Sequence, residues 1–236
     1  MRRFWIWMNI IYEKCMLAVF VVALLITLYG LYDAWYVYSK AGDDSYLKYK
    51  PTESGAPEDS PITDDMVAWI TVDDTSIDYP VMQGKNNSEY LNLNSYGEYS
   101  LYGSIFLDSR NASDFSDDYS ILYGHHMEYG KMFGALDNYL DKGYMKEHNC
   151  GTLLIGRDGR ESYDIGIFAS MQVDAKDSKN LDPLSFDEAM NIISKEAVVF
   201  DESVPAGGRI LVLSTCTEPT TDKRLLVFCY IYDKAK

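Results

Sequence analysis

The segment from Cys15 to Tyr32 places the strongest limit on what this chain can fold into. It is a run of 18 residues without a charge, CMLAVFVVALLITLYGLY, and a helix needs about 17–25 apolar residues to span a bilayer. A cleaved signal peptide is the alternative, but its apolar core is usually about 7–15 residues long. Only a weak small-x-small cleavage pattern follows, at Ser39 and Ala41. The run therefore favours an uncleaved transmembrane anchor over residues 15–38, after a cytoplasmic N-terminus of residues 1–14.

The charges on either side of this run predict its orientation. Arg2, Arg3 and Lys14 precede it, and acidic residues follow from Asp33 onward. Cationic flanks stay in the cytoplasm. We therefore expect a single-pass anchor in the cell membrane, with the C-terminal part outside the cell. The whole chain has a net charge of −15. Residues 1–38 carry +1, so the remaining residues carry −16. Phosphate binding needs a stripe of Lys and Arg, and none is visible, which argues against nucleic acid as a partner.

Beyond the anchor, composition separates a linker from a folded domain. Residues 39–61 include YLKYKPTESGAPEDSP, whose Pro, Ser, Gly and charges are typical of a linker. Residues 62–236 are expected to form one domain of mainly short strands. Asp158-Gly159 is a two-residue hairpin signal between two of them.

Three short helices are expected among the strands. Thr63 is positioned to cap one over residues 64–70, residues 131–140 form another, and residues 185–197 open with a capping box of Ser185 and Glu188. Many closely spaced strands with isolated helices indicate a closed or nearly closed β-barrel.

Cys216 is the best candidate nucleophile among the four cysteines. No CxxC spacing links them, so neither a zinc site nor a disulfide framework is expected. Cys15 lies in the apolar run, and Cys229 lies in a strand-like segment where a buried, inert thiol is ordinary. Cys216 lies near the end of the run ILVLSTCT, where a strand end projects a side chain from a rigid frame. A core cysteine is an equally good interpretation of this position alone.

A cysteine enzyme also needs a base or a cation, because a free thiol is mostly protonated at neutral pH. His125 and His126 form a Gly-His-His turn after the strand YSILYG. Adjacent strand residues point to opposite faces, so one of them can face a cleft, and a shared metal site is a weaker alternative. Arg224 starts the strand after Cys216, and antiparallel pairing brings it back beside that end. It is either an oxyanion-stabilising cation or an ordinary salt-bridged arginine.

Together these features resemble the sortase family. YGHHM at 123–127, LSTC at 213–216 and the dipeptide at 223–224 occur in the family's order. LSTC matches the last four positions of its T/S-L-x-T-C signature, and Val212 replaces the first. DYPVMQGKNNSEYLN, GSIFLDSRN and the capped helix before the Cys strand resemble class B members.

The resemblance implies an eight-stranded β-barrel and a cysteine transpeptidase that faces the cell wall. Such an enzyme cleaves the C-terminal sorting signal of surface proteins after Thr and transfers them to an amine of peptidoglycan, either a precursor or a cross-bridge. It implies Cys216 as nucleophile, His125 as acid and base, and Arg224 as oxyanion-stabilising cation, with no metal or organic cofactor. It also implies substrate contacts at Asn87, Leu91, Tyr123, Ser214 and Thr215. Thr217 stands where some class B members have Glu.

Two alternatives to transpeptidation remain open. One is a thiol hydrolase that passes the acyl group to water, and the other is a non-catalytic barrel that binds wall polymer or a partner protein. A class C, pilin-polymerising role is less favoured, because the linker lacks an Asp-Pro-Trp-like lid.

Overall fold

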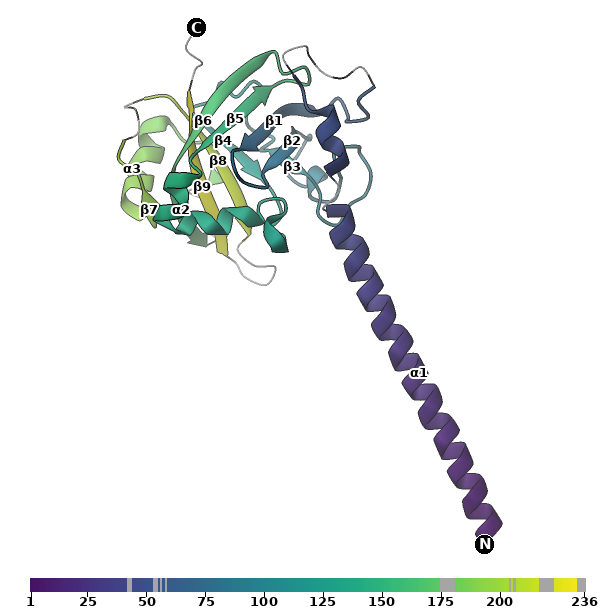
Figure 1. The fold of residues 1–236 in the computed structure, drawn as a ribbon. Helices are drawn as coiled ribbons and strands as arrows, with labels where there is room; N and C mark the ends of the chain where they lie inside the picture. Colours follow the sequence, from purple (N-terminus) through teal and green to yellow (C-terminus); the bar gives the residue numbers. More distant parts are fainter. Residues whose placement is uncertain are drawn as a thin grey trace. The chain divides into compact units, whose positions relative to one another are not determined.

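The computed structural model describes residues 1–41, 44–52, 55, 57, 59–174, 181–203, 205, 207–216 and 223–232 (Figure 1). The chain divides into two compact units, residues 1–43 and 44–236. The domain divisions expected after residues 14, 38 and 61 stay predictions, because a division by contacts does not locate a membrane.

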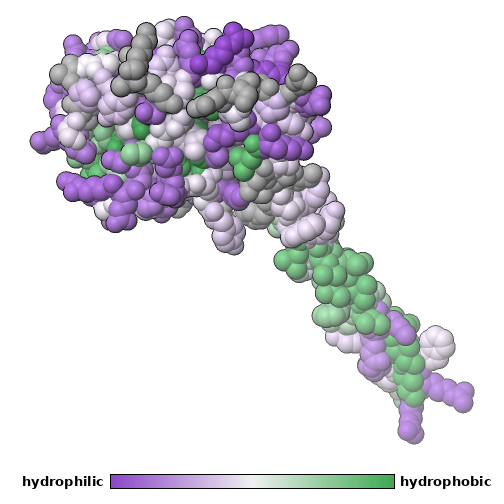
Figure 2. All heavy atoms as spheres, turned by 45° about the horizontal axis from the view of Figure 1, so that its top comes forward, coloured by the Kyte–Doolittle hydropathy of each residue, from purple (hydrophilic) through white to green (hydrophobic). Residues whose placement is uncertain are grey.

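The first unit is a single helix, α1, spanning Arg2–Ala41. Its segment Arg2–Tyr36 is long and apolar enough to cross a membrane, and its most apolar stretch is not buried within the protein. Figure 2 shows apolar side chains along this helix. An exposed apolar surface of this length costs free energy in water and is stable in hydrocarbon. The predicted apolar N-terminal helix is therefore confirmed, and its orientation stays a prediction.

The second unit is a β-barrel. Its described residues form one sheet of nine strands: β1 (Met66–Val72), β2 (Asp78–Met82), β3 (Ile105–Leu107), β4 (Tyr119–Tyr123), β5 (Cys150–Ile155), β6 (Glu161–Asp174), β7 (Val199–Phe200), β8 (Arg209–Cys216) and β9 (Lys223–Tyr232). The order is β5-β1-β2-β3-β4-β8-β9-β6-β7, and a further pairing of β5 with β6 closes it. Eight strands therefore form the closed barrel that the sequence predicts, with the two-residue β7 added to β6.

Short helices connect the strands. They are η1 (Asp44–Tyr49), η2 (Glu89–Leu91), η3 (Glu128–Gly130), η4 (Gly134–Leu140), α2 (Lys142–Glu147) and α3 (Phe186–Glu196). The predicted capping box is present at α3, where the Ser185 and Glu188 side chains each accept a hydrogen bond from the other's backbone N–H. The predicted helix at 131–140 is the 3₁₀ helix η4, and the sequence did not predict α2.

Alternation along the strands separates two apolar clusters. Leu225, Val227 and Cys229 of β9 pack inside the barrel with residues of the other long strands. Leu226 and Phe228 belong to a cluster drawn from β4, β6, β8, β9 and α3. Because that cluster includes buried residues of α3, it lies on the outer face of the barrel, between the sheet and this helix.

The helix predicted over residues 64–70 is wrong, because these residues form most of β1. Ala68 and Ile70 pack inside the barrel, while Met66 and Trp69 pack in a third cluster on the other face. β1 is hydrogen-bonded to β2 on one side and β5 on the other, and burial on both faces hides the period-2 pattern. Thr63 does not cap a helix, and its hydroxyl lies 3.3 Å from that of Tyr90.

Part of the segment assigned to the linker packs against the barrel. The Tyr46 ring lies 6.0 Å from the Trp69 ring, centroid to centroid. Lys50 Nζ lies 2.8 Å from Asp78 Oδ1, and Asp78 also accepts a hydrogen bond from Trp69 Nε1. Aromatic rings therefore hold residues 46–50 in place within a stretch whose overall composition is that of a linker.

Candidate active site

Cys216 and Arg224 occupy directly opposed positions on neighbouring strands. β8 and β9 pair antiparallel, and Cys216 and Arg224 are Cα partners at the end of that ladder. On the other side of β8, β4 pairs parallel with it, so β4, β8 and β9 lie side by side (Figure 1). The antiparallel pairing predicted from the sequence therefore places these two residues opposite each other.

Two polar atoms in this region are buried and have no hydrogen-bond partner among the described residues: Arg224 Nε and Ser214 Oγ. Leu226 is the Cα partner of Ser214 and packs in the outer cluster. Alternation puts Ser214 and Arg224 on that outer face as well. A buried polar atom is normally hydrogen-bonded, because leaving it without a partner costs free energy. The pair is thus suited to oxygen atoms of a bound substrate.

The two adjacent histidines have different surroundings. His125 follows the end of β4, where Gly124 N donates a 3.1 Å hydrogen bond to Ser214 O. His125 Nε2 lies 3.2 Å from the carbonyl oxygen of Leu91. His126 Nε2 lies 2.7 Å from Asp137 Oδ2. His126 is therefore held by η4, whereas His125 lies beside a residue that the sequence assigns to substrate binding.

The predicted substrate contacts fall into two groups. Asn87 and Leu91 lie on the segment around η2, where Asn87 Oδ1 accepts a 2.7 Å hydrogen bond from Ser109 N. Tyr123 and Ser214 are Cα partners on β4 and β8. Thr215 is fully buried, and alternation places it on the opposite face from Ser214. The structure thus pairs Tyr123 with Ser214 and places Asn87 and Leu91 on one neighbouring segment of the chain, and a contact at Thr215 would have to use its backbone.

Sequence reasoning missed a buried carboxylate next to this site. Asp108 is fully buried and accepts hydrogen bonds from Arg110 Nε at 3.0 Å, Arg110 Nη2 at 2.8 Å and the Tyr123 hydroxyl at 3.0 Å. Burial opposes ionisation of Asp108, but the hydrogen bonds from Arg110 and Tyr123 outweigh it and hold its pKa below the usual value. Burial, and then the nearby carboxylate, raise the pKa of Tyr123. The signal in the sequence was the Asp-x-Arg pair inside GSIFLDSRN.

Comparison with known proteins identifies the family. The sortase domain model matches residues 70–231, which is more than half of the chain. The chain belongs to the sortase family. A sortase B of Listeria monocytogenes is 35% identical over 170 residues, covering 69% of this sortase and 68% of that protein. A sortase B of Staphylococcus aureus is 33% identical over 178 residues, covering 72% and 71%.

Solved structures agree on class B. A Streptococcus pyogenes class B sortase involved in pilus biogenesis has a TM-score of 0.66 and 41% identity, covering 72% of this chain and 94% of that one. The Staphylococcus aureus sortase B–substrate complex has a TM-score of 0.66 and 30% identity, covering 74% and 82%. This protein is thus a class B member of the sortase family of enzymes, and class B is associated with cell-wall anchoring.

Two other cysteines of this sortase are described within the barrel unit, Cys150 and Cys229. Cys229 is buried inside the barrel, and burial raises the pKa of its thiol, so an inert role is appropriate there. Cys150 is exposed at the start of β5.

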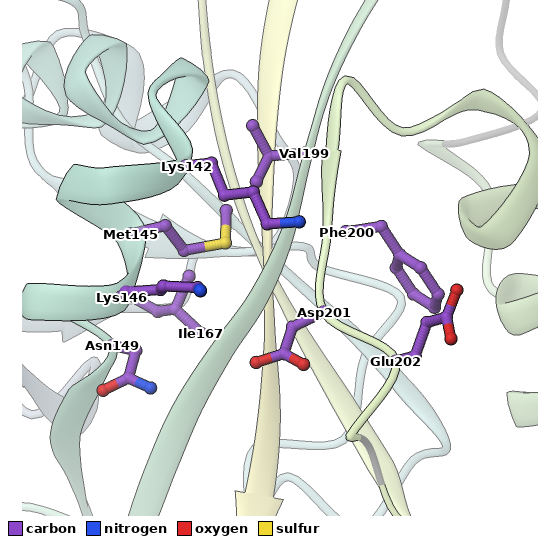
Figure 3. Close-up of a pocket in the computed structure, with 9 residues that line it drawn as sticks. All are labelled: Lys142, Met145, Lys146, Asn149, Ile167, Val199, Phe200, Asp201 and Glu202. Carbon is purple, nitrogen blue, oxygen red and sulfur yellow. The ribbon is translucent and has the colours of Figure 1, made fainter.

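This sortase also has a cavity of about 200 Å³ whose lining includes none of the predicted site residues. Figure 3 shows Lys142 and Lys146 of α2 on one side and Asp201 on the other. Hydrogen bonds from Ser203, and then these two lysines, hold the pKa of Asp201 below its usual value. The lysine charges in this cavity are therefore already partly offset within the protein.

Proposed function

We propose that this sortase is a membrane-anchored cysteine transpeptidase with Cys216, His125 and Arg224 as its catalytic residues. The observation that carries the proposal is the direct pairing of Cys216 with Arg224, next to the strand that ends before His125. Family membership supports the same assignment, since the three residues occupy the family's motif positions.

The proposed reaction has two acyl-transfer steps. His125 takes the proton of the Cys216 thiol and returns a proton when the thiol is released at the end of the cycle. The Cys216 thiolate attacks the carbonyl carbon of Thr in the sorting signal, and the negative charge that develops on the oxygen lies near Arg224. His125 gives a proton to the leaving amine as the peptide bond breaks, which leaves a thioester. An incoming amine then attacks the thioester, His125 accepts its proton, and the C–S bond breaks to release a new amide and the free thiol.

The donor in this proposal is a surface protein with a C-terminal sorting motif, and the acceptor is a peptidoglycan amine. Structures of the Staphylococcus aureus sortase B with a substrate, and of a sortase B with triglycine, support a peptide donor and an amine acceptor. A protein amine on a pilus subunit is a second candidate acceptor. The relative involved in pilus biogenesis, at 41% identity, favours keeping it.

The test uses a labelled peptide of the form (N/S/P)PxT(N/G) with and without an amine acceptor. Transpeptidation predicts cleavage after Thr and a ligated product when the acceptor is present. A hydrolase would give only the free acid in both arms. Cys216→Ala is expected to abolish both products, with Cys150→Ala as the matched exposed-cysteine control. Equal turnover by Cys216→Ala and the unaltered protein would contradict the proposal.

A further inference from the structure

We propose that Arg110 is a positioning residue for substrate binding, which acts by joining the chain before α3 to the carboxylate that orients Tyr123. The inference rests on the proposed function, because it concerns the peptide that the same site would bind.

Arg110 has two sets of partners. Its Nε and Nη2 atoms bind both oxygens of Asp108 at 3.0 and 2.8 Å. Its Nη1 atom binds Asp182 Oδ1 at 2.9 Å, and Nη2 also binds the carbonyl oxygen of Leu181 at 2.6 Å. Only a planar guanidinium can hold a carboxylate with two nitrogens and still reach a second segment. Arg110 therefore reaches Leu181 and Asp182, which lie 71 and 72 positions further along the chain.

The two ends of this connection differ in solvent exposure. The Asp108 side chain is 1% exposed, whereas the side chains of Arg110 and Asp182 are 45% and 55% exposed. A buried carboxylate must be paired to remain charged, so the Arg110–Asp108 ion pair is the stronger of the two contacts. The contact with Asp182 is at the surface and is screened by water. Arg110 thus holds the surface segment at Leu181 and Asp182 against the buried Asp108 carboxylate, which is the fixed point of the network.

That fixed point orients Tyr123. The Tyr123 hydroxyl donates to Asp108 Oδ2 at 3.0 Å, and its ring lies 5.4 Å from the Phe106 ring. Tyr123 is the Cα partner of Ser214 and directly precedes the Gly-His pair. A tyrosine held at both ring and hydroxyl presents a defined surface to a peptide lying on β4 and β8.

Residues 108–110 also hold a second predicted substrate contact, Asn87, because Ser109 N donates a hydrogen bond to Asn87 Oδ1 at 2.7 Å. Residues 108–110 therefore touch the segment around η2, the end of β4 and the chain before α3. Leu181 and Leu184 of that last segment pack against the outer cluster. The network positions the surroundings of the site, while the pairing of Cys216 with Arg224 is made by the strands themselves.

The experiment compares Arg110→Ala, Arg110→Lys and the unaltered full-length protein with the labelled sorting peptide. Arg110→Ala is expected to raise KM about tenfold, equivalent to about 1.4 kcal/mol, and to leave kcat within about threefold. Alkylation of Cys216 by iodoacetamide needs no bound peptide, so its rate should not change. Arg110→Lys should restore part of the loss, since it keeps the charge but loses the fork.

Arg157→Ala is the control, because the Arg157 guanidinium likewise binds a carboxylate, of Asp64, and a carbonyl oxygen, of Ser60, but not the residues around Tyr123. Its KM should be unchanged. Asp182→Ala is the second variant in case Arg110→Ala does not fold, since it keeps the Asp108 pair and should still raise KM.

Each outcome bears on one of the two proposals. Unchanged KM in both Arg110→Ala and Asp182→Ala overturns this inference alone. Parallel loss of kcat and of the alkylation rate also overturns it, by showing a general distortion of the site. No turnover by the unaltered protein would overturn the proposed function, and with it this inference.

Discussion

Arg224 has a buried Nε atom without a partner among the described residues, beside the strand end that carries Cys216. Removing one donor to a developing oxyanion typically costs about 10²–10³ in turnover. Arg224→Ala is therefore expected to lower kcat by about that factor in the peptide assay. The thermal unfolding midpoint should change little, because this side chain is only partly buried at the end of β9.

Two variants refine this prediction. Arg224→Lys should recover only part of the loss, because lysine lacks the planar set of donors. Lys223→Ala should be nearly silent, since neighbouring strand residues face opposite ways. A damaging Lys223→Ala with a harmless Arg224→Ala would show that the oxyanion cation has been assigned to the wrong residue.

The two histidines give a second prediction at this scale. His125→Ala is expected to abolish peptide cleavage, because it removes the acid and base of the proposed reaction. His126→Ala should retain substantial activity, since its contact with Asp137 involves a partly exposed pair and such pairs contribute about 0–1 kcal/mol. Cleavage rates of the two purified variants decide the matter, and the reverse pattern would exchange their roles.

Asp108 gives a prediction about pH. Its pKa is lower in the folded protein than its usual value. Its contribution to stability is therefore fully present above the unfolded pKa of about 3.9 and is lost as pH falls through the folded value. Asp108→Asn should be less stable than the unaltered protein at neutral pH, and the difference should narrow in acid. Thermal unfolding from pH 6 to pH 3 measures this, and a constant difference would contradict it.

Among the elements, α3 depends on its N-terminal cap. Ser185 Oγ accepts from Glu188 N at 3.4 Å, and Glu188 Oε2 accepts from Ser185 N at 3.1 Å. Losing an N-cap serine typically costs about 1 kcal/mol, so Ser185→Ala should lower the free energy of unfolding by about that amount in urea. Ser194→Ala is the matched control, since Ser194 is exposed on the same helix and its hydroxyl donates a hydrogen bond to Asn191 O. An equal loss in both variants would argue against the cap.

Local signals in the sequence predicted the elements that depend on neighbouring residues. The capping box at Ser185 forms. The predicted hairpin does join β5 and β6, but its loop covers residues 156–160 and is not a two-residue turn, and Gly159 within it has the positive φ of 63° that favours glycine. The prediction failed for β1, whose residues are buried on both faces, so that no alternation distinguishes a strand from a helix. Barrel closure depends on β6, which pairs with β5 over one part and with β9 along most of its length.

The same distinction applies to the site. Cys216 and Arg224 are eight positions apart on consecutive strands, so antiparallel pairing predicted that they are Cα partners. The link from Arg110 to Asp182 joins residues 72 positions apart, and no pattern in the sequence pairs one particular arginine with one of many carboxylates. Family resemblance supplied Asn87 and Tyr123, but it did not supply the turn that holds them both.

For the whole molecule, the exposed apolar helix α1 leads to a prediction about topology. Arg2 and Arg3 precede the apolar run, so the N-terminus should remain in the cytoplasm and the barrel should lie outside. Protease added to intact, wall-stripped cells is expected to remove the barrel, as detected with an antibody against it. A cytoplasmic protein probed in the same sample controls for lysis, and protection of the barrel in intact cells would contradict this orientation.

The pairing of β4 with β8 also determines when the site can exist. Tyr119 pairs with Ile210, 91 positions later, and a chain is synthesised from its N-terminus. The strand before His125 therefore gains its neighbour, the strand that ends in Cys216, only after the residues between the two strands have been synthesised. Among the described strands, β9, which carries Arg224 and joins β8 to β6, is the last to be made. Under the proposed function, the catalytic site therefore forms only after β8 and β9 have been made and have paired with their neighbours.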